Sequence, residues 1–163
     1  MSNTRVMKGD IGDIVNELIS KNPQVHYVLI HGCNCFNTMG AGLAARIAKL
    51  YPEAKKADEV TAPADRSKLG TISHVTINQN LSIANVYTQY HYGRDPNTVY
   101  LNYDALRNGL KMVTYTFPEE LDGGVCILYP QEIGCGLAGG DINEVTEIID
   151  DVLQNRTRIA FKR

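Results

Sequence analysis

Two apolar segments that each run into a glycine-rich segment constrain the fold of this chain most. Residues Val25–His31 (VHYVLIH) and Val125–Tyr129 (VCILY) are continuous apolar runs, typical of strands that are buried on both faces. The first continues into His31–Leu43 (HGCNCFNTMGAGL) and the second leads to Ile133–Gly140 (IGCGLAGG). Strands of this kind occur in sheets that helices cover on both sides, so the pattern predicts an α/β domain.

Periodic apolar residues predict helices between these strands and after the second one. The expected helices span Ile11–Ser20, about Gly40–Leu50, Val99–Val113 and a segment that Asp141 would cap, with Glu144 completing a capping box. Shorter strands are expected at Thr4–Lys8, Gly70–Ile77, Leu81–Gln89 and Arg158–Phe161, and the middle two would form a hairpin. The alternation and the hairpin predict a three-layer α/β/α fold with a mixed central sheet, built as a single domain of residues 1–163.

The composition narrows the class of protein. The chain has 163 residues, 44% of them hydrophobic, which is enough for the core of one domain. A net charge of −2 and a pI near 6.1 argue against a large polyanion such as nucleic acid, while a small anion could still bind at a local site. No apolar stretch approaches the roughly 20 residues that span a bilayer, and no signal peptide is evident. We therefore expect a cytoplasmic protein without a membrane partner.

The four cysteines predict neither a disulfide framework nor a metal site. Cys33 and Cys35 are spaced like half of a zinc site, but the second pair of ligands is not evident. Disulfide scaffolds are usually shorter and richer in cysteine. We therefore expect reduced thiols, and no metal ion or other cofactor.

Both glycine-rich segments have the composition of loops that hold phosphate through main-chain N–H groups. Gly40, Ala41 and Gly42 would let the backbone approach a ligand closely, and the helix that follows would present unpaired N–H groups. The spacing matches neither a Walker A loop nor a dinucleotide fingerprint. Four of the eight residues of Ile133–Gly140 are glycine, more than a tight turn requires. Two such loops would suit a diphosphate; helix packing for the first and a flexible hinge for the second remain the alternatives.

Three polar residues near the ends of predicted strands are candidates for ligand contacts. Asp10 stands where it could cap a helix or accept a hydrogen bond from an exocyclic amine such as that of adenine. His31 and Asn34 flank the first glycine-rich segment, where histidine could act as an acid, base or nucleophile and asparagine could bind a ribose or phosphate. A structural role for His31 is the alternative.

The segments KGDIGDI (8–14), VLIHGCNCFNTMGAGLAARIAKLYPEAKKAD (28–58) and YPQEIGCGLAGGD (129–141) together resemble the macro domain family. The resemblance is strongest to small stand-alone ADP-ribose-1″-phosphate phosphatases and to related glutamate-type ADP-ribosyl hydrolases. It implies that Asp10 binds the adenine amino group, that Asn34 binds the distal ribose, and that both loops cradle the phosphates. The ligand-binding residues expected on this basis are Asp10, Ile11, Thr38, Met39, Gly40, Ala41, Gly42, Leu43, Ile133, Gly134, Cys135, Gly136, Leu137 and Ala138.

Two departures from the glutamate-type hydrolases bear on the chemistry. Gln89 stands where those enzymes have a catalytic lysine, and Ala138 stands where they have an aspartate. Asp141, three residues further on, could substitute for that aspartate, although helix capping explains it equally well. The lysine–aspartate mechanism is therefore not expected here.

The resemblance implies removal of the terminal phosphate from ADP-ribose 1″-phosphate, with His31, Asn34 and Asp141 as the catalytic residues. Two alternatives remain open: removal of ADP-ribose from protein or from a nucleic-acid base, and binding of ADP-ribose without turnover. The expected partner is ADP-ribose or its 1″-phosphate, and nucleic acid is expected only as an ADP-ribosylated substrate.

Overall fold

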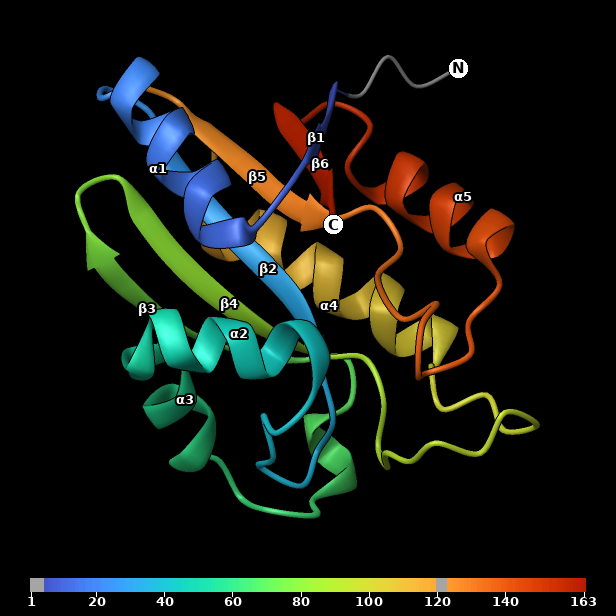
Figure 1. Ribbon diagram of the computed structural model, residues 1–163. Helices are drawn as coiled ribbons and strands as arrows, with labels where there is room; N and C mark the ends of the chain where they lie inside the picture. The colour runs from blue at the N-terminus through green and yellow to red at the C-terminus, as the bar shows by residue number, and fades with distance from the viewer. Residues whose placement is uncertain (1–4, 120–122) are drawn as a thin grey trace.

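Six strands form one sheet at the centre of the molecule (Figure 1). The structure is a computed structural model that describes residues 5–119 and 123–163. The order along the sheet is β1-β6-β5-β2-β4-β3. Strands β3 and β4 pair antiparallel, and the other neighbours pair parallel. This mixed sheet confirms the predicted fold class. The strands are β1 (Arg5–Lys8), β2 (His26–Cys33), β3 (Ile72–Asn78), β4 (Leu81–Tyr87), β5 (Val125–Pro130) and β6 (Arg158–Lys162).

Helices cover both faces of the sheet and bury two separate apolar cores. Helices α1 (Ile11–Lys21), α2 (Gly42–Leu50) and α3 (Pro52–Glu59) pack on one face, and α4 (Tyr103–Thr116) and α5 (Ile142–Val152) pack on the other. Because side chains alternate along a strand, β2 contributes Tyr27 and Leu29 to the first core and Val28 and Ile30 to the second. The three layers are therefore helix, sheet and helix, as predicted.

Two elements differ from the sequence prediction, and one predicted residue is outside the described chain. Helix α3 follows α2 almost directly, since Pro52 ends one helix and occupies the first turn of the next. Helix α4 begins at Tyr103 rather than Val99, because Asn102 caps it through a hydrogen bond to the Ala105 N–H. Thr4, the predicted start of the first strand, lies outside the described residues.

Candidate functional site

A pocket of about 750 Å³ lies where the carboxyl ends of the parallel strands meet. Its wall includes residues that follow β1, β2, β4 and β5, together with the last residues of β6. Ligands of open α/β sheets bind at this edge, and pockets of this volume hold small molecules. The two glycine-rich loops enter the pocket from adjacent strands, since β2 pairs directly with β5.

The first loop is braced internally and leaves a row of main-chain donors free. Asn34 donates to the carbonyl and hydroxyl oxygens of Thr38, at 3.2 and 2.9 Å, and accepts a hydrogen bond from the Phe36 N–H at 2.8 Å. Helix α2 starts without a side-chain cap. Within the described chain, five successive main-chain N–H groups donate to no protein acceptor: those of Gly40, Ala41, Gly42, Leu43 and Ala44.

The second loop is fixed by the segment that precedes α4. The Ala138 carbonyl accepts hydrogen bonds from the N–H groups of Tyr100 and Leu101, at 2.8 and 3.1 Å. Gly134 has a φ of +74°, and a Cβ there would lie 2.7 Å from a methyl group of Leu101, so only glycine fits. In the described residues, four N–H groups of this loop have no protein acceptor: those of Gly134, Gly136, Leu137 and Ala138.

Asp10 lies at one end of the pocket, where it caps α1 and forms an ion pair with Arg46. Its Oδ2 accepts hydrogen bonds from the N–H groups of Gly12 and Asp13, at 3.0 and 3.4 Å. Arg46 on α2 adds a bidentate contact, with Nε 2.8 Å from Oδ1 and Nη2 3.0 Å from Oδ2. The hydrogen bond from Arg46 holds the pKa of the Asp10 carboxyl below its usual value. The carboxylate therefore remains charged and still has lone pairs for a further donor.

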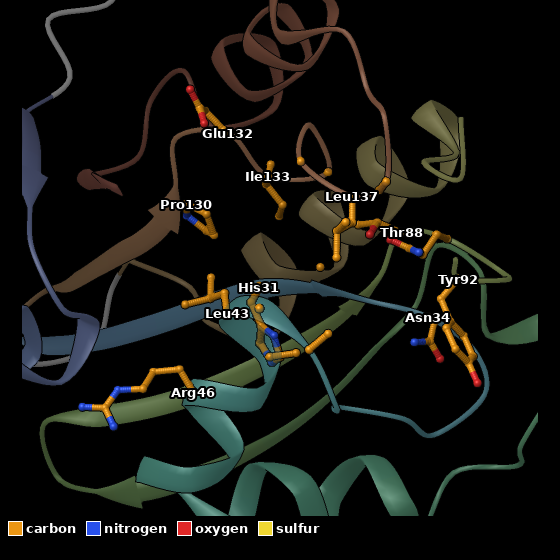
Figure 2. A pocket seen from close by; sticks show the side chains of 18 of the residues that line it. His31, Asn34, Leu43, Arg46, Thr88, Tyr92, Pro130, Glu132, Ile133 and Leu137 are labelled. Atoms are coloured by element: carbon orange, nitrogen blue, oxygen red, sulfur yellow. The ribbon is translucent and has the colours of Figure 1, made fainter. Parts of the chain in front are cut away.

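His31 borders the pocket, but its ring is turned into the protein. It shares a face of β2 with Leu29, and Figure 2 shows the ring beside α2. The side chain is 1% exposed, Nε2 lies 2.6 Å from Asn85 Oδ1, and Cys33 Sγ is 3.6 Å from Nδ1. Burial lowers the pKa of His31 to about 4. Because Nε2 is paired with Asn85 and the ring is almost completely buried, this geometry does not support the expected role of His31 as a catalytic acid, base or nucleophile.

A chain of buried hydrogen bonds continues from His31 toward α3. Asn85 donates to Ser73 Oγ at 3.0 Å, Ser73 Oγ lies 2.8 Å from the Tyr87 hydroxyl, and Tyr87 donates to Asp58 Oδ1 at 2.7 Å. Since Asn85 Oδ1 can only accept, the Nε2 of His31 carries the proton. Burial raises the pKa of the Asp58 carboxyl. This network therefore holds the neutral ring of His31 in a fixed position at the wall of the pocket.

Asp141 serves as the N-cap of α5, as predicted, but Glu144 does not complete the predicted capping box, because the Asp141 N–H donates to the Tyr103 hydroxyl instead. Its Oδ1 accepts hydrogen bonds from the N–H groups of Asn143 and Glu144, at 2.8 and 3.3 Å, and its own N–H donates to the Tyr103 hydroxyl. The side chain is not on the pocket wall. Helix capping, the alternative that the sequence left open, therefore accounts for the contacts of Asp141 better than catalysis does.

The other expected residues divide between the wall and the core. Met39 is buried in the core beneath α1 and α2, and Cys135 packs against the core on the α4 and α5 side of the sheet, so neither lines the pocket. The structure brings the remaining expected residues together on the wall: Asp10, Ile11, Asn34, Thr38, Gly40, Ala41, Gly42, Leu43, Ile133, Gly134, Gly136, Leu137 and Ala138. Sequence reasoning did not name Arg46, Thr88 or Tyr92 as site residues, although Arg46 lies within the segment 28–58 that carries the resemblance.

Charged side chains on the pocket wall are mostly basic. Asp10 and Glu132 are the acidic members, and Arg46 already pairs with Asp10. The basic members are Arg46, Arg94, Lys162 and Arg163. The pocket is therefore suited to an anion even though the whole chain has a net charge of −2.

The ring of Tyr92 lies beside Asn34 at the end of the pocket away from Arg46 (Figure 2) and belongs to a cluster of aromatic rings. The Phe36 ring centroid lies 4.7 Å from that of His91 and 6.1 Å from that of Tyr92. The Arg66 guanidinium carbon lies 3.8 Å from the centroid of Tyr90, which also contacts Phe36. Tyr92 is 48% exposed and lines the pocket, so part of this aromatic cluster is open to a ligand.

Two further kinds of site are absent from the described residues. No group of three or more His, Cys, Asp or Glu side chains could hold a metal ion. No helix in the part of the chain that the structure describes is both long enough and apolar enough to cross a membrane.

Comparison with known proteins gives one sequence relative and several structures with the same fold. An uncharacterized 17.5 kDa protein of phage T4, encoded in the tk-vs intergenic region, is 31% identical over 150 residues, which covers 90% of this chain and 87% of that protein. No family model matches the sequence.

Three solved structures with the same fold are more distant in sequence. A Streptomyces coelicolor macrodomain protein has a TM-score of 0.70 at 19% identity and covers 99% of each chain. The macrodomain of Thermus aquaticus DarG has a TM-score of 0.69 at 20% identity, covering 98% of this chain and 97% of its own. Thermosipho africanus DarTG in complex with ADP-ribose has a TM-score of 0.59 at 18% identity over 83% of this chain and 39% of that one. With its mixed sheet and its pocket between two glycine-rich loops, this chain has the fold of the macrodomain proteins.

Proposed function

We propose that this chain binds ADP-ribose in the pocket described above. The observation that carries the proposal is the convergence of unpaired main-chain N–H groups from two loops, Gly40–Ala44 and Gly134–Ala138, on one pocket. Such donors, together with the start of helix α2, favour a phosphate group. The shared fold with Thermosipho DarTG, whose structure holds ADP-ribose, supports the same ligand.

The polar residues at the two ends of the pocket set the orientation of the ligand. Asp10 would accept a hydrogen bond from the adenine amino group, because its carboxylate keeps a lone pair that Arg46 does not use. Asn34, at the other end, would bind the distal ribose through the second lone pair of its Oδ1. The diphosphate would then lie between the two loops.

Calorimetry with ADP-ribose tests this orientation. Asp10→Asn keeps a good N-cap residue but removes the charged acceptor, so we expect the affinity to fall about tenfold. Asp13→Asn is the matched control, because Asp13 lies in the same helical turn but outside the pocket. Absence of ADP-ribose binding by the unaltered protein would refute the proposal.

The reaction we propose is hydrolysis of the terminal phosphate of ADP-ribose 1″-phosphate. In this hydrolysis a water molecule attacks the phosphorus of the 1″-phosphate, the bond between phosphorus and the 1″ oxygen breaks, and that oxygen takes up a proton, which gives ADP-ribose and inorganic phosphate. Asn34 would position the distal ribose for this step. His31 would act as a positioning residue, since its buried ring supports β2 and the start of the first loop.

Release of inorganic phosphate from ADP-ribose 1″-phosphate measures this activity. We expect Asn34→Ala to lower turnover, because it removes both the ribose contact and the hydrogen bonds that brace the loop. Asp141→Asn should retain full turnover, since Asp141 is outside the pocket. A rate equal to that of buffer alone would eliminate the phosphatase proposal and leave ADP-ribose binding intact.

The aromatic cluster favours a second candidate, removal of ADP-ribose from a nucleic-acid base. Tyr92 lies beside Asn34, where the group attached to the distal ribose would leave the pocket, and an exposed aromatic ring can stack on a base. Parallel assays with ADP-ribose 1″-phosphate and ADP-ribosylated DNA would separate the two candidates. Tyr92→Ala should reduce turnover of the DNA substrate and leave the phosphate substrate unaffected if the second candidate holds.

A further inference from the structure

The hydroxyl group of Thr88 is a buried donor without a protein partner on the pocket wall. Thr88 follows β4 directly and has 0% exposure. Its N–H donates to the Cys33 carbonyl at 3.2 Å, and its carbonyl accepts from the Asn102 N–H at 2.8 Å. Only its Oγ1 is left without a hydrogen-bond partner in the described protein. Leaving a buried hydroxyl unpaired destabilises a fold, so such a group indicates a ligand-binding role.

Neighbouring residues place this hydroxyl where the two glycine-rich loops begin to converge. A Cβ added to Gly32, at the end of β2, would lie 2.8 Å from Thr88 Oγ1 and 3.5 Å from Ile133 Cγ1. The missing side chain at Gly32 therefore makes room for the hydroxyl between the first loop and the second. Figure 2 shows Thr88 among the side chains of the pocket wall, which also includes Leu137 of the second loop.

We propose that the Thr88 hydroxyl donates a hydrogen bond to an oxygen of the ligand's diphosphate. The inference rests on the proposed binding of ADP-ribose and adds a side-chain contact that no motif of the sequence marks. The free groups around this position are main-chain N–H donors, so the centre of the pocket offers donors to an anion. A threonine hydroxyl at the same place can extend that set of donors to another phosphate oxygen.

Two variants at this position separate the hydroxyl from the shape of the side chain. Thr88→Val removes the hydroxyl and keeps the branched shape, and Thr88→Ser keeps the hydroxyl. Thr71→Val is the matched control, because Thr71 donates its hydroxyl to the Lys68 carbonyl at 2.7 Å and lies outside the pocket.

The experiment combines calorimetry with ADP-ribose, ADP and adenosine and thermal unfolding of each variant without ligand. Thr88→Val should bind ADP-ribose and ADP about tenfold more weakly, as expected for loss of a hydrogen bond to a charged group, and should bind adenosine unchanged. Thr88→Ser should retain most of the affinity. Without ligand, Thr88→Val should be at least as stable as the unaltered protein, whereas Thr71→Val should be less stable with unaltered affinity.

Three other results would overturn the proposal, each for a different reason. Unaltered ADP-ribose affinity of Thr88→Val would mean that the hydroxyl does not contact the ligand. Weaker binding of ADP-ribose with unchanged binding of ADP would move the contact to the distal ribose. If the unaltered protein bound neither compound, the proposed function itself would fail along with this inference.

Discussion

The ring of His31 is kept neutral by its position inside the protein. Burial lowers its pKa to about 4, whereas an unfolded chain would have a histidine pKa near 6.5. The hydrogen bond to Asn85 opposes this shift without cancelling it. Protonation of His31 therefore disfavours the folded state.

This shift predicts a loss of stability in mild acid. Between pH 6.5 and pH 4 the unfolded chain binds a proton at His31 that the folded protein does not, so stability falls as the pH falls. The difference in unfolding free energy between the unaltered protein and His31→Gln should shrink by about 2 kcal/mol between pH 7 and pH 4.5. Denaturant titrations at both pH values would measure it, and a difference independent of pH would contradict the buried, neutral ring.

Side-chain alternation in β2 explains why the position of His31 could have been predicted and its partners could not. Leu29 and His31 are two residues apart and share a face, which a buried strand turns toward a helical layer. Asn85 is 54 residues away, and its contact with His31 depends on the pairing of β2 with β4. The sequence contains no local signal for that pairing.

Among the helices, capping residues predicted the first residue of a helix well. Helix starts that were predicted from apolar periodicity alone were less accurate. Asp10 and Asp141 cap α1 and α5 at the predicted positions. Residues 99–101 continue the apolar pattern of α4, yet they are not helical, and Tyr100 and Leu101 donate their N–H groups to the Ala138 carbonyl instead. A tertiary contact therefore overrides helical periodicity, and it is the same contact that fixes the second loop.

The cap at Asp141 gives a direct test of its structural role. Asp141→Ala leaves the N–H groups of Asn143 and Glu144 without their acceptor and should reduce the unfolding free energy by about 1 kcal/mol. Asp141→Asn should be close to the unaltered protein, since asparagine is also a good N-cap. Thermal unfolding and the phosphate-release assay, run on both variants, should show loss of stability in one and loss of turnover in neither. Reduced turnover in Asp141→Asn would restore a catalytic role.

The glycines of the two loops can be tested without disturbing the fold. At Gly40 and Gly136, φ is not in the left-handed region and an added Cβ would meet nothing within 4 Å, so alanine should be tolerated structurally. Both residues line the pocket, where a methyl group would separate the main-chain donors from a phosphate. We expect Gly40→Ala and Gly136→Ala to bind ADP-ribose about 10–100-fold more weakly with unchanged thermal stability.

Gly109 provides a control for the two loop glycines, because substitution there should change stability and not ligand affinity. A Cβ at this position of α4 would meet a methyl group of Val86 closely, and Gly109 is not on the pocket wall. Gly109→Ala should therefore lose stability and keep its affinity for ADP-ribose. Unchanged affinity in Gly40→Ala and Gly136→Ala would show that these loops do not hold the phosphates.

Over the whole molecule, the pocket joins parts of the chain that are far apart in sequence. The sequence predicted the alternating elements, and therefore the edge of the sheet at which loops would meet. It did not predict the pairing of Asp10 with Arg46 across 36 positions, or the place of Thr88 beside Gly32, because these depend on how α2 and β4 pack. Local patterns thus located the main-chain donors, and tertiary packing decided which side chains accompany them.

Because the pocket draws on loops from both layers of helices, ligand binding should stabilise the entire domain. ADP-ribose at about 100 times its Kd should add about 2.7 kcal/mol to the unfolding free energy. For a chain of 163 residues this corresponds to a rise in Tm of roughly 5–10 °C. Gly40→Ala, at the same ADP-ribose concentration, should show a clearly smaller rise from the same starting Tm, since it alters only the binding step. Differential scanning calorimetry over a range of ADP-ribose concentrations would measure both, and a Tm that did not depend on ligand concentration would be incompatible with a pocket that binds ADP-ribose only in the folded protein.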